Sequence, residues 1–126
     1  MKKQIIATEL APKAIGPYSQ GMKAGNMIYT SGQLPIDAVS GVMETEISKA
    51  TARCLENVKA VLEAAGSSLD KVVKTLVFLE NMDDFAAMNE VYGKFFNENP
   101  PARSCVQVAK LPKGAVVEIE VIALCD

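Results

Sequence analysis

The sequence predicts an α+β fold in which two helices cover one face of a mixed β-sheet. Segments rich in β-branched and aromatic residues alternate with two segments in which apolar residues recur at every third or fourth position. These are the periods of strands and amphipathic helices. Each helical segment lies between two strand segments, so right-handed crossovers place both helices on the same side of the sheet. At 126 residues, the chain is long enough for one hydrophobic core, and we expect a single domain over residues 1–126.

The N-terminal part of the chain predicts three strands and a loop. The strands are expected over residues 5–8, 19–24 and 27–31. Gly25 and Asn26 predict a hairpin turn between the second and the third of these strands. Residues 32–41 follow as a loop, because a glycine stands at each end and Pro35 interrupts the segment.

Two helices are predicted from the apolar periodicity. The first covers residues 45–65, with Thr45 as its N-cap and Gly66 as its C-terminal stop. Its apolar stripe consists of Ile47, Ala50, Cys54, Leu55, Val58, Val61, Leu62 and Ala65. The second helix covers residues 84–96, starts after Asp83 as its cap and ends before a pair of prolines.

The C-terminal strands predict a second buried face. Strands are expected over residues 72–79, 103–109 and 116–124, the last two joined as a hairpin centred near Pro112 and Lys113. The first and the last of these strands carry apolar residues on both faces, although two helices can cover one face only. Each large apolar side chain left exposed forfeits about 1.5 to 3 kcal/mol. We therefore expect an obligate homo-oligomer in which other copies of the chain bury the second face.

The composition excludes several classes of function. The chain has no histidine, which rules out Ser-His-Asp and Cys-His catalysis as well as histidine-ligated zinc. A net charge of -2 provides no broad cationic surface and disfavours nucleic acid as a partner. No apolar run reaches membrane-spanning length, and no signal peptide is evident. Three widely spaced cysteines without a C-x-x-C pair are typical of a reducing cytoplasm, where we expect the protein to be located.

Charged residues interrupt two of the apolar C-terminal strands, where a lone buried charge is costly. Strand alternation places Arg103 and Cys105 on one face, and Glu118 and Glu120 together on a face of the next strand. In the predicted hairpin, Arg103 lies about 13 Å along the strand from the position opposite Glu118, a gap that a substrate, a water or a neighbouring subunit must bridge. Arg103 either binds the carboxylate of a small organic acid or forms a salt bridge with Glu118 or Glu120. The spacing leaves both interpretations open.

Four further residues are weaker candidates. Cys105 is a small core residue unless a base activates its thiol, and the sequence identifies no such base. Tyr18 follows a Gly-Pro turn, where its ring either packs with the hydroxyl in solvent or closes over a ligand. Ser31 at a strand end and Asn89 on a helix flank occupy positions where such residues usually make local hydrogen bonds.

The chain closely resembles the Rid family of enamine/imine deaminases, specifically its RidA subgroup, in the segments AIGPYSQG, GNMIYTSGQLP, KTLVFLENMDDFAAMN and PPARSCVQVAKLPKGAVVEIE. The resemblance implies a chorismate-mutase-like fold and a homotrimer with a barrel-like core and pockets between subunits. It also implies hydrolysis of 2-iminopropanoate and 2-iminobutanoate to 2-oxo acids and ammonia, without metal or cofactor. The resemblance further implies that these imines derive from enamines released by pyridoxal-phosphate-dependent serine and threonine dehydratases.

The resemblance also implies roles for individual residues. Arg103 would bind the substrate carboxylate, while Glu118 and the main-chain carbonyl of Cys105 would hold the attacking water. The pocket would be lined by Tyr18, Ser31, Gly32 and Asn89. Two alternatives remain: a small-carboxylate sensor or chaperone-like protein without turnover, and an endoribonuclease or translation inhibitor, against which the net charge and the lack of histidine argue.

Overall fold

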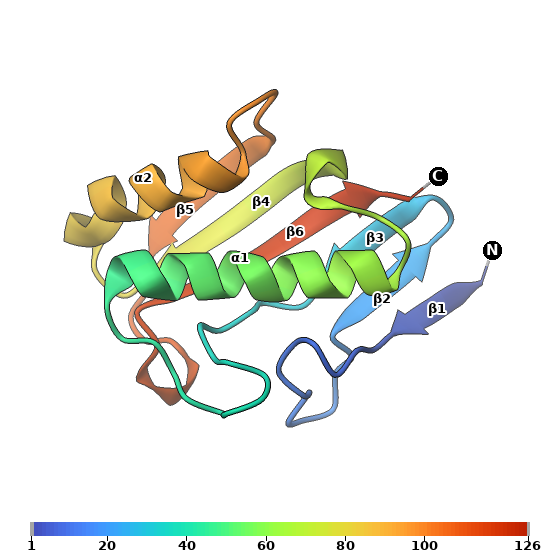
Figure 1. Cartoon of the computed structure of the whole chain (residues 1–126), viewed down its shortest axis with the longest axis horizontal. Helices are drawn as coiled ribbons and strands as arrows, with labels where there is room; N and C mark the ends of the chain where they lie inside the picture. Colours follow the sequence, from blue (N-terminus) through green and yellow to red (C-terminus); the bar gives the residue numbers. More distant parts are fainter. Residues whose placement is uncertain (1, 126) are drawn as a thin grey trace.

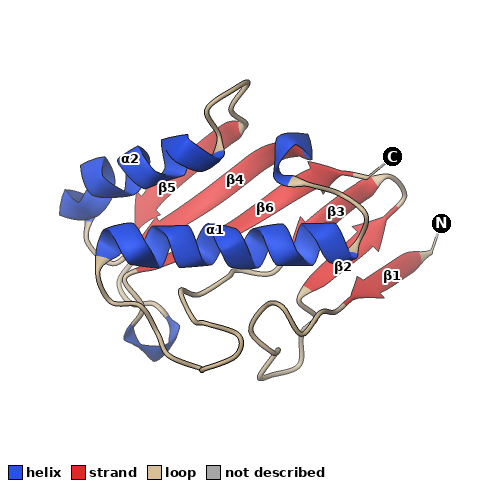
Figure 2. Ribbon diagram, viewed as in Figure 1, coloured by secondary structure: helices blue, strands red, loops and turns tan. Residues whose placement is uncertain are grey.

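The computed structural model describes residues 2–125 and arranges them as a six-stranded sheet with two long helices on one face (Figures 1 and 2). The strands are β1 (Lys3–Ile6), β2 (Gly21–Ala24), β3 (Met27–Thr30), β4 (Val72–Leu79), β5 (Ala102–Gln107) and β6 (Val117–Leu124). The helices are α1 (Ile47–Ala64) and α2 (Phe85–Phe95), with short 3-10 turns at Leu69–Lys71, Met82–Asp84 and Pro112–Gly114. The predicted α+β class is confirmed, and the strand ends differ from the predicted ones by a residue or two. Within the described residues, neither long helix has the length and apolar character that a membrane span requires.

The predicted hairpin between the last two strands is wrong. The strand order is β1-β2-β3-β6-β4-β5, and β4 runs parallel to β5 and antiparallel to β6. Phe78 of β4 accordingly pairs with Val106 on one side and with Glu118 on the other. β4 therefore has a hydrogen-bonded neighbour along both of its edges, and residues 108–116 carry the chain past its end. β5 is therefore an edge of an open sheet.

Helix α1 has the predicted apolar stripe but a different N-cap. Its buried residues include Ala50, Cys54, Leu55, Val58, Val61 and Leu62. The cap is Glu46, whose carboxylate accepts a hydrogen bond from the Lys49 amide at 2.7 Å, and Thr45 lies outside the helix. A carboxylate at this position also interacts favourably with the helix dipole. At the other end, the helix stops before Gly66, which has a left-handed φ of 82° and confirms the predicted stop.

Helix α2 is preceded by a 3-10 turn that the sequence did not reveal. The side chain of Asn81 accepts a hydrogen bond from the Asp83 amide at 2.9 Å and so caps the turn Met82–Asp84. Asp83 is therefore part of the turn and not the cap of the helix. Asp84 occupies the N-cap position of α2, where its side chain makes no capping hydrogen bond.

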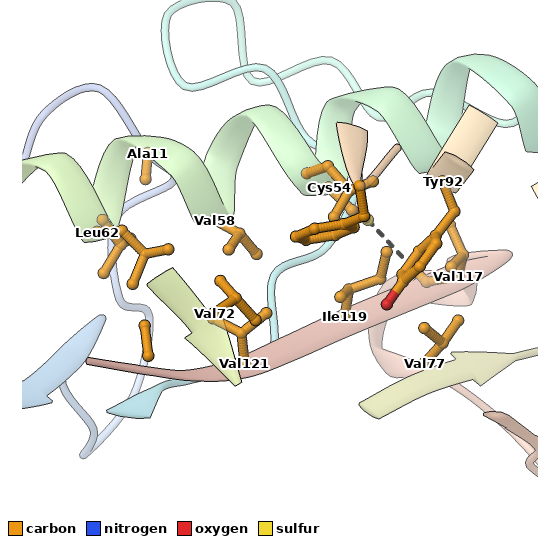
Figure 3. Packing of buried hydrophobic residues seen from close by; sticks show 14 of the residues in the cluster. Ala11, Cys54, Val58, Leu62, Val72, Val77, Tyr92, Val117, Ile119 and Val121 are labelled. Atoms are coloured by element: carbon orange, nitrogen blue, oxygen red, sulfur yellow. Dashed lines mark hydrogen bonds between the residues drawn. The ribbon is translucent and has the colours of Figure 1, made fainter. Parts of the chain in front are cut away.

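The hydrophobic core lies between the helices and the sheet. Figure 3 shows Val58 and Leu62 of α1 directed toward the sheet, where Ile119 and Val121 of β6 project from below. Alternate residues of β6, beginning with Val117, are buried on this helix-covered face. The strand thus directs the intervening residues to the opposite face.

The opposite face of the sheet is not covered by any element of the described chain (Figure 1). It carries Glu118, Glu120 and Ile122 of β6, all only partly buried. Tyr29 is 45% exposed and Val106 is 44% exposed, so this face leaves large apolar side chains partly in solvent. The predicted apolar second face is confirmed, and the predicted burial of this face by other copies stays a prediction.

Candidate active site

Three loops meet at one end of the molecule and form a cavity of about 650 Å³ with the uncovered face of β6. These loops follow β1, β3 and β5 and lie together at the bottom of Figure 1. Among the lining residues are four of the predicted site residues, Tyr18, Ser31, Gly32 and Glu118, together with Glu120, Lys13 and Lys113. Arg103, Asn89 and Cys105 are not among them.

Gly32 and Glu118 are in direct contact. A Cβ atom added to Gly32 would lie 1.8 Å from Oε2 of Glu118, so any side chain at this position would displace the Glu118 carboxylate. The contact is held by the next residue, because the Gln33 amide donates to the Ile119 carbonyl at 2.8 Å and the Ile119 amide donates back at 3.2 Å. The chain leaving β3 therefore runs along β6, and the carboxylate of Glu118 rests against the backbone of Gly32.

Ser31 and Gln20 shape the wall that carries Tyr18. The hydroxyl of Ser31 donates to the Ser19 carbonyl at 2.5 Å, a local bond of the kind expected for a serine at a strand end. Gln20 is almost fully buried, and its amide group accepts from the Thr8 amide at 2.7 Å and donates to the Pro12 carbonyl at 2.8 Å. Sequence reasoning missed Gln20, and its position between a turn and a strand gave no signal. The ring of Tyr18 remains 49% exposed at the cavity.

The surroundings of Glu118 in the cavity keep its carboxyl group protonated to a higher pH than a glutamate in water. Burial raises the pKa of Glu118 above its ordinary value of 4.5, and the nearby Glu120 raises it further. Among the described residues, an ion pair joins Arg53 to Asp37, while Glu118 and Glu120 have none. The interpretation of Arg103 as a salt-bridge partner of these glutamates is therefore wrong within one chain.

Arg103 is held on the helix-covered side of the edge strand β5. Its Nη1 donates to Oδ1 of Asn89 at 2.7 Å. The guanidinium carbon lies 4.8 Å from the ring centroid of Tyr92 and 5.5 Å from that of Phe85. Tyr92 is itself fixed by a 2.7 Å hydrogen bond between its hydroxyl and that of Thr75. Helix α2 thus orients the guanidinium through one hydrogen bond and two aromatic contacts.

Cys105 has a core side chain and a main chain at the sheet edge. Its thiol is half-buried against the core, and burial raises its pKa while the charge of Arg103 opposes this shift. The Val108 amide donates to the Leu79 carbonyl, so strand alternation turns the main-chain groups of Arg103 and Cys105 away from β4. The thiol matches the predicted core role, and the carbonyl is placed where a ligand can reach it.

The two groups of predicted site residues lie on opposite faces of the sheet. Arg103 pairs with Thr75, whose side chain is buried under the helices, whereas Glu118 pairs with Phe78 on the uncovered face. The two pairs are also separated by about 10 Å along β4. Within one chain, Arg103 and Asn89 therefore do not meet Glu118, Gly32 or Tyr18.

Comparison with known proteins identifies the family. A family model described as endoribonuclease L-PSP matches residues 8–125. The chain belongs to the endoribonuclease L-PSP family. A crystal structure of a Rid-family protein from Yersinia pestis superimposes on the chain with a TM-score of 0.94 at 46% identity. It covers 98% of this chain and 99% of that one. These matches confirm the family assignment drawn from the sequence.

Curated relatives and solved structures of the endoribonuclease L-PSP family match the chain over nearly its full length. A 2-iminobutanoate/2-iminopropanoate deaminase of Escherichia coli K12 is 50% identical, covering 94% of this chain and 95% of its own. A RutC family protein of Pyrococcus abyssi is 52% identical and covers 98% of each chain. The crystal structure of Escherichia coli TdcF with bound serine is 46% identical, with a TM-score of 0.95, and covers 98% of this chain and 99% of that one.

Proposed function

We propose that the protein is a 2-iminobutanoate/2-iminopropanoate deaminase that hydrolyses 2-imino acids to 2-oxo acids and ammonia. The observation that carries this proposal is the match to curated deaminases of that name at about 50% identity over nearly the whole chain. The site chemistry supports it: a fixed guanidinium suits a carboxylate, and a half-buried carboxylic acid suits proton transfer. The serine bound to the related TdcF supports a small amino-acid-like ligand.

The reaction requires little beyond orientation and proton transfer. Arg103 holds the substrate carboxylate, and a water held by Glu118 and the Cys105 carbonyl attacks carbon 2 of the protonated imine. Glu118 accepts a proton from this water and passes it to the nitrogen of the carbinolamine. As the carbon–nitrogen bond breaks, the Glu118 carboxylate accepts the proton of the carbinolamine hydroxyl, and the 2-oxo acid forms. Ammonia takes up this proton as it leaves, which returns Glu118 to its starting carboxylate form. General acid-base help of about 10² to 10⁴-fold is sufficient, because imines already hydrolyse in water.

The proposed active site is completed by a second copy of the chain in a homotrimer. Arg103, Cys105 and Asn89 of one subunit would face Glu118, Gly32 and Tyr18 of its neighbour, because these groups cannot meet within one chain. The free edge of β5 and the partly exposed apolar residues of the uncovered face support such packing. We place the protein in the cytoplasm, functionally beside pyridoxal-phosphate-dependent serine and threonine dehydratases.

A coupled assay tests this function. Purified protein is added to a threonine dehydratase, and the release of 2-oxobutanoate and ammonia is followed over time. The conditions are chosen so that hydrolysis of the released imine, and not the dehydratase itself, limits the rate. We expect the parent protein to accelerate imine loss and Arg103→Met to lose this acceleration. Equal rates with parent, variant and buffer would reject the deaminase and favour a carboxylate sensor without turnover.

Endoribonuclease activity is the second candidate, because the matching family model is described by that name. The net charge of -2 and the absence of histidine argue against it. An RNA cleavage assay with parent protein and Arg103→Ala decides the point. Cleavage that the parent shows and the variant loses would support this activity, and cleavage by both would indicate a contaminating nuclease.

A further inference from the structure

Asn57 is a fully buried polar residue in the middle of helix α1. Its Nδ2 donates to the Leu34 carbonyl at 3.0 Å and to the Ile36 carbonyl at 2.9 Å. Its Oδ1, among the described residues, has no hydrogen-bond partner. An unpaired buried amide oxygen is unfavourable, so an apolar residue would be the better choice if this position served packing alone.

The two carbonyls that Asn57 holds belong to the wall of the candidate site. Leu34 and Ile36 both line the cavity that contains Glu118. Leu34 directly follows Gln33, whose paired hydrogen bonds with Ile119 keep the chain beside β6, and Ile36 lies two residues further on. A shift of this wall is therefore passed on within two residues to Gly32, against which the Glu118 carboxylate rests.

A second side chain of α1 supports the same loop. Arg53 lies one helical turn before Asn57 and so on the same face of the helix, and its Nη2 is 3.8 Å from Oδ2 of Asp37. The other oxygen of Asp37 accepts from the amides of Val39 and Ser40 at 2.9 and 2.8 Å, which gives the loop a fixed turn. The ion pair is partly exposed, so the buried amide of Asn57 is the stronger of the two attachments.

We propose that Asn57 is a positioning residue of the active site, which fixes the loop at residues 34–36 and thereby holds Gly32 against the catalytic Glu118. This inference rests on the proposed deaminase function for its kinetic consequence. The contact between Gly32 and Glu118 is tight, so a small displacement of either residue changes where the Glu118 carboxylate points. A misplacement of about 1 Å in a catalytic group costs about 10²-fold in rate.

The test compares Asn57→Leu with the parent protein in the coupled deaminase assay. We expect kcat to fall by about tenfold to a hundredfold. The dissociation constant of 2-oxobutanoate should change by less than about threefold, because Arg103 on another element holds the carboxylate. Hydrogen exchange of the amides at residues 34–42 should become at least about tenfold faster, independently of any activity. If Asn57→Leu does not fold, Asn57→Ser replaces it, since a hydroxyl provides one donor where two are needed.

Thr51→Val is the matched control. Thr51 is equally buried in α1, but its hydroxyl donates to the Ile47 carbonyl of its own helix at 2.8 Å and not to the loop. We expect parent-like kcat and loop exchange in this variant. The inference is overturned if Asn57→Leu keeps parent kcat and parent exchange, or if Thr51→Val shows the same losses. A parent protein without deaminase activity would instead reject the proposed function, and the exchange measurement would still decide the role of Asn57 in holding the loop.

Discussion

Gly32 is the residue at which the candidate site has the least space. The sequence marked it only as the first residue of a loop and, through the family resemblance, as part of the pocket wall. The structure gives the physical reason, since its backbone is in contact with the carboxylate of Glu118. Its requirement is for space and not for an unusual φ, a distinction that sequence alone does not make.

Gly32→Ala should therefore displace Glu118 and reduce deaminase kcat by about 10²-fold. Gly93 in α2 provides the control, because a Cβ there meets nothing within 4 Å. Gly93→Ala should keep parent kcat and raise the free energy of unfolding by about 0.5 to 1 kcal/mol through its higher helix propensity. Steady-state kinetics and urea unfolding check both variants. A fully active Gly32→Ala would mean that Glu118 need not rest where it does.

Glu120 acts on the proton affinity of Glu118, whose pKa it raises together with burial. The charged form of Glu118 is the base in the proposed mechanism, so kcat/KM falls as the pH drops through its pKa. Glu120→Gln removes one cause of the raised pKa and should move this acidic limb to lower pH. Lys13, Lys113 and Asp37 also line the cavity and remain unchanged. A pH profile of kcat/KM measures the shift, and Glu56→Gln on the exposed face of α1 should leave the limb in place.

The proton on Glu118 also couples stability to pH. Because its pKa is higher in the folded than in the unfolded state, the resulting stabilisation is complete below the ordinary value of 4.5 and is lost as the pH rises through the folded pKa. The contribution of Glu118 to the free energy of unfolding should thus decline over this window, which urea unfolding of the parent and of Glu118→Gln at several pH values measures.

At the scale of elements, the helices were easier to predict than the strand pairing. The apolar stripe of α1 and its stop at Gly66 follow from local periodicity and backbone conformation. The sheet order does not follow from local pattern, because it depends on hydrogen-bonded pairing between strands that are far apart in the sequence. β4 lies between β5 and β6, so Arg103 and Glu118 are on opposite faces of the sheet and not on neighbouring strands of a hairpin as predicted.

The N-cap of α1 gives a prediction at this scale. Glu46→Ala removes the 2.7 Å bond to the Lys49 amide and should lower the free energy of unfolding by about 1 kcal/mol. Thr45→Ala should change it by less than about 0.5 kcal/mol, since Thr45 lies outside the helix. Urea unfolding followed by circular dichroism separates the two. A larger effect of Thr45→Ala would restore the cap assigned from the sequence.

At the scale of the whole molecule, the apolar second face of the sheet was predictable from composition, while the partition of the site between two faces was not. Strand alternation correctly put Arg103 and Cys105 on one face of β5, and Glu118 and Glu120 on one face of β6. Only the sheet order decides whether these two faces lie on the same side of the sheet. The proposed trimer resolves this arrangement by bringing one subunit's Arg103 to the next subunit's Glu118.

Mixed trimers provide the sharpest test of this arrangement. Arg103→Met and Glu118→Gln subunits, each inactive alone, are expressed together so that they assemble at random. A site shared between neighbours then contains both intact groups in about one quarter of cases, and deaminase activity should recover to about that fraction of the parent value. Light scattering should show particles of three chains. No recovery in confirmed mixed trimers would place both groups in the same subunit's site.

In the proposed trimer, the two groups of site residues lie on opposite faces of each sheet, so activity requires the association of subunits. A separated subunit would carry one half of each of two active sites and no complete site. Dilution should therefore lower the specific activity as the subunits dissociate, because a separated subunit contains no complete site.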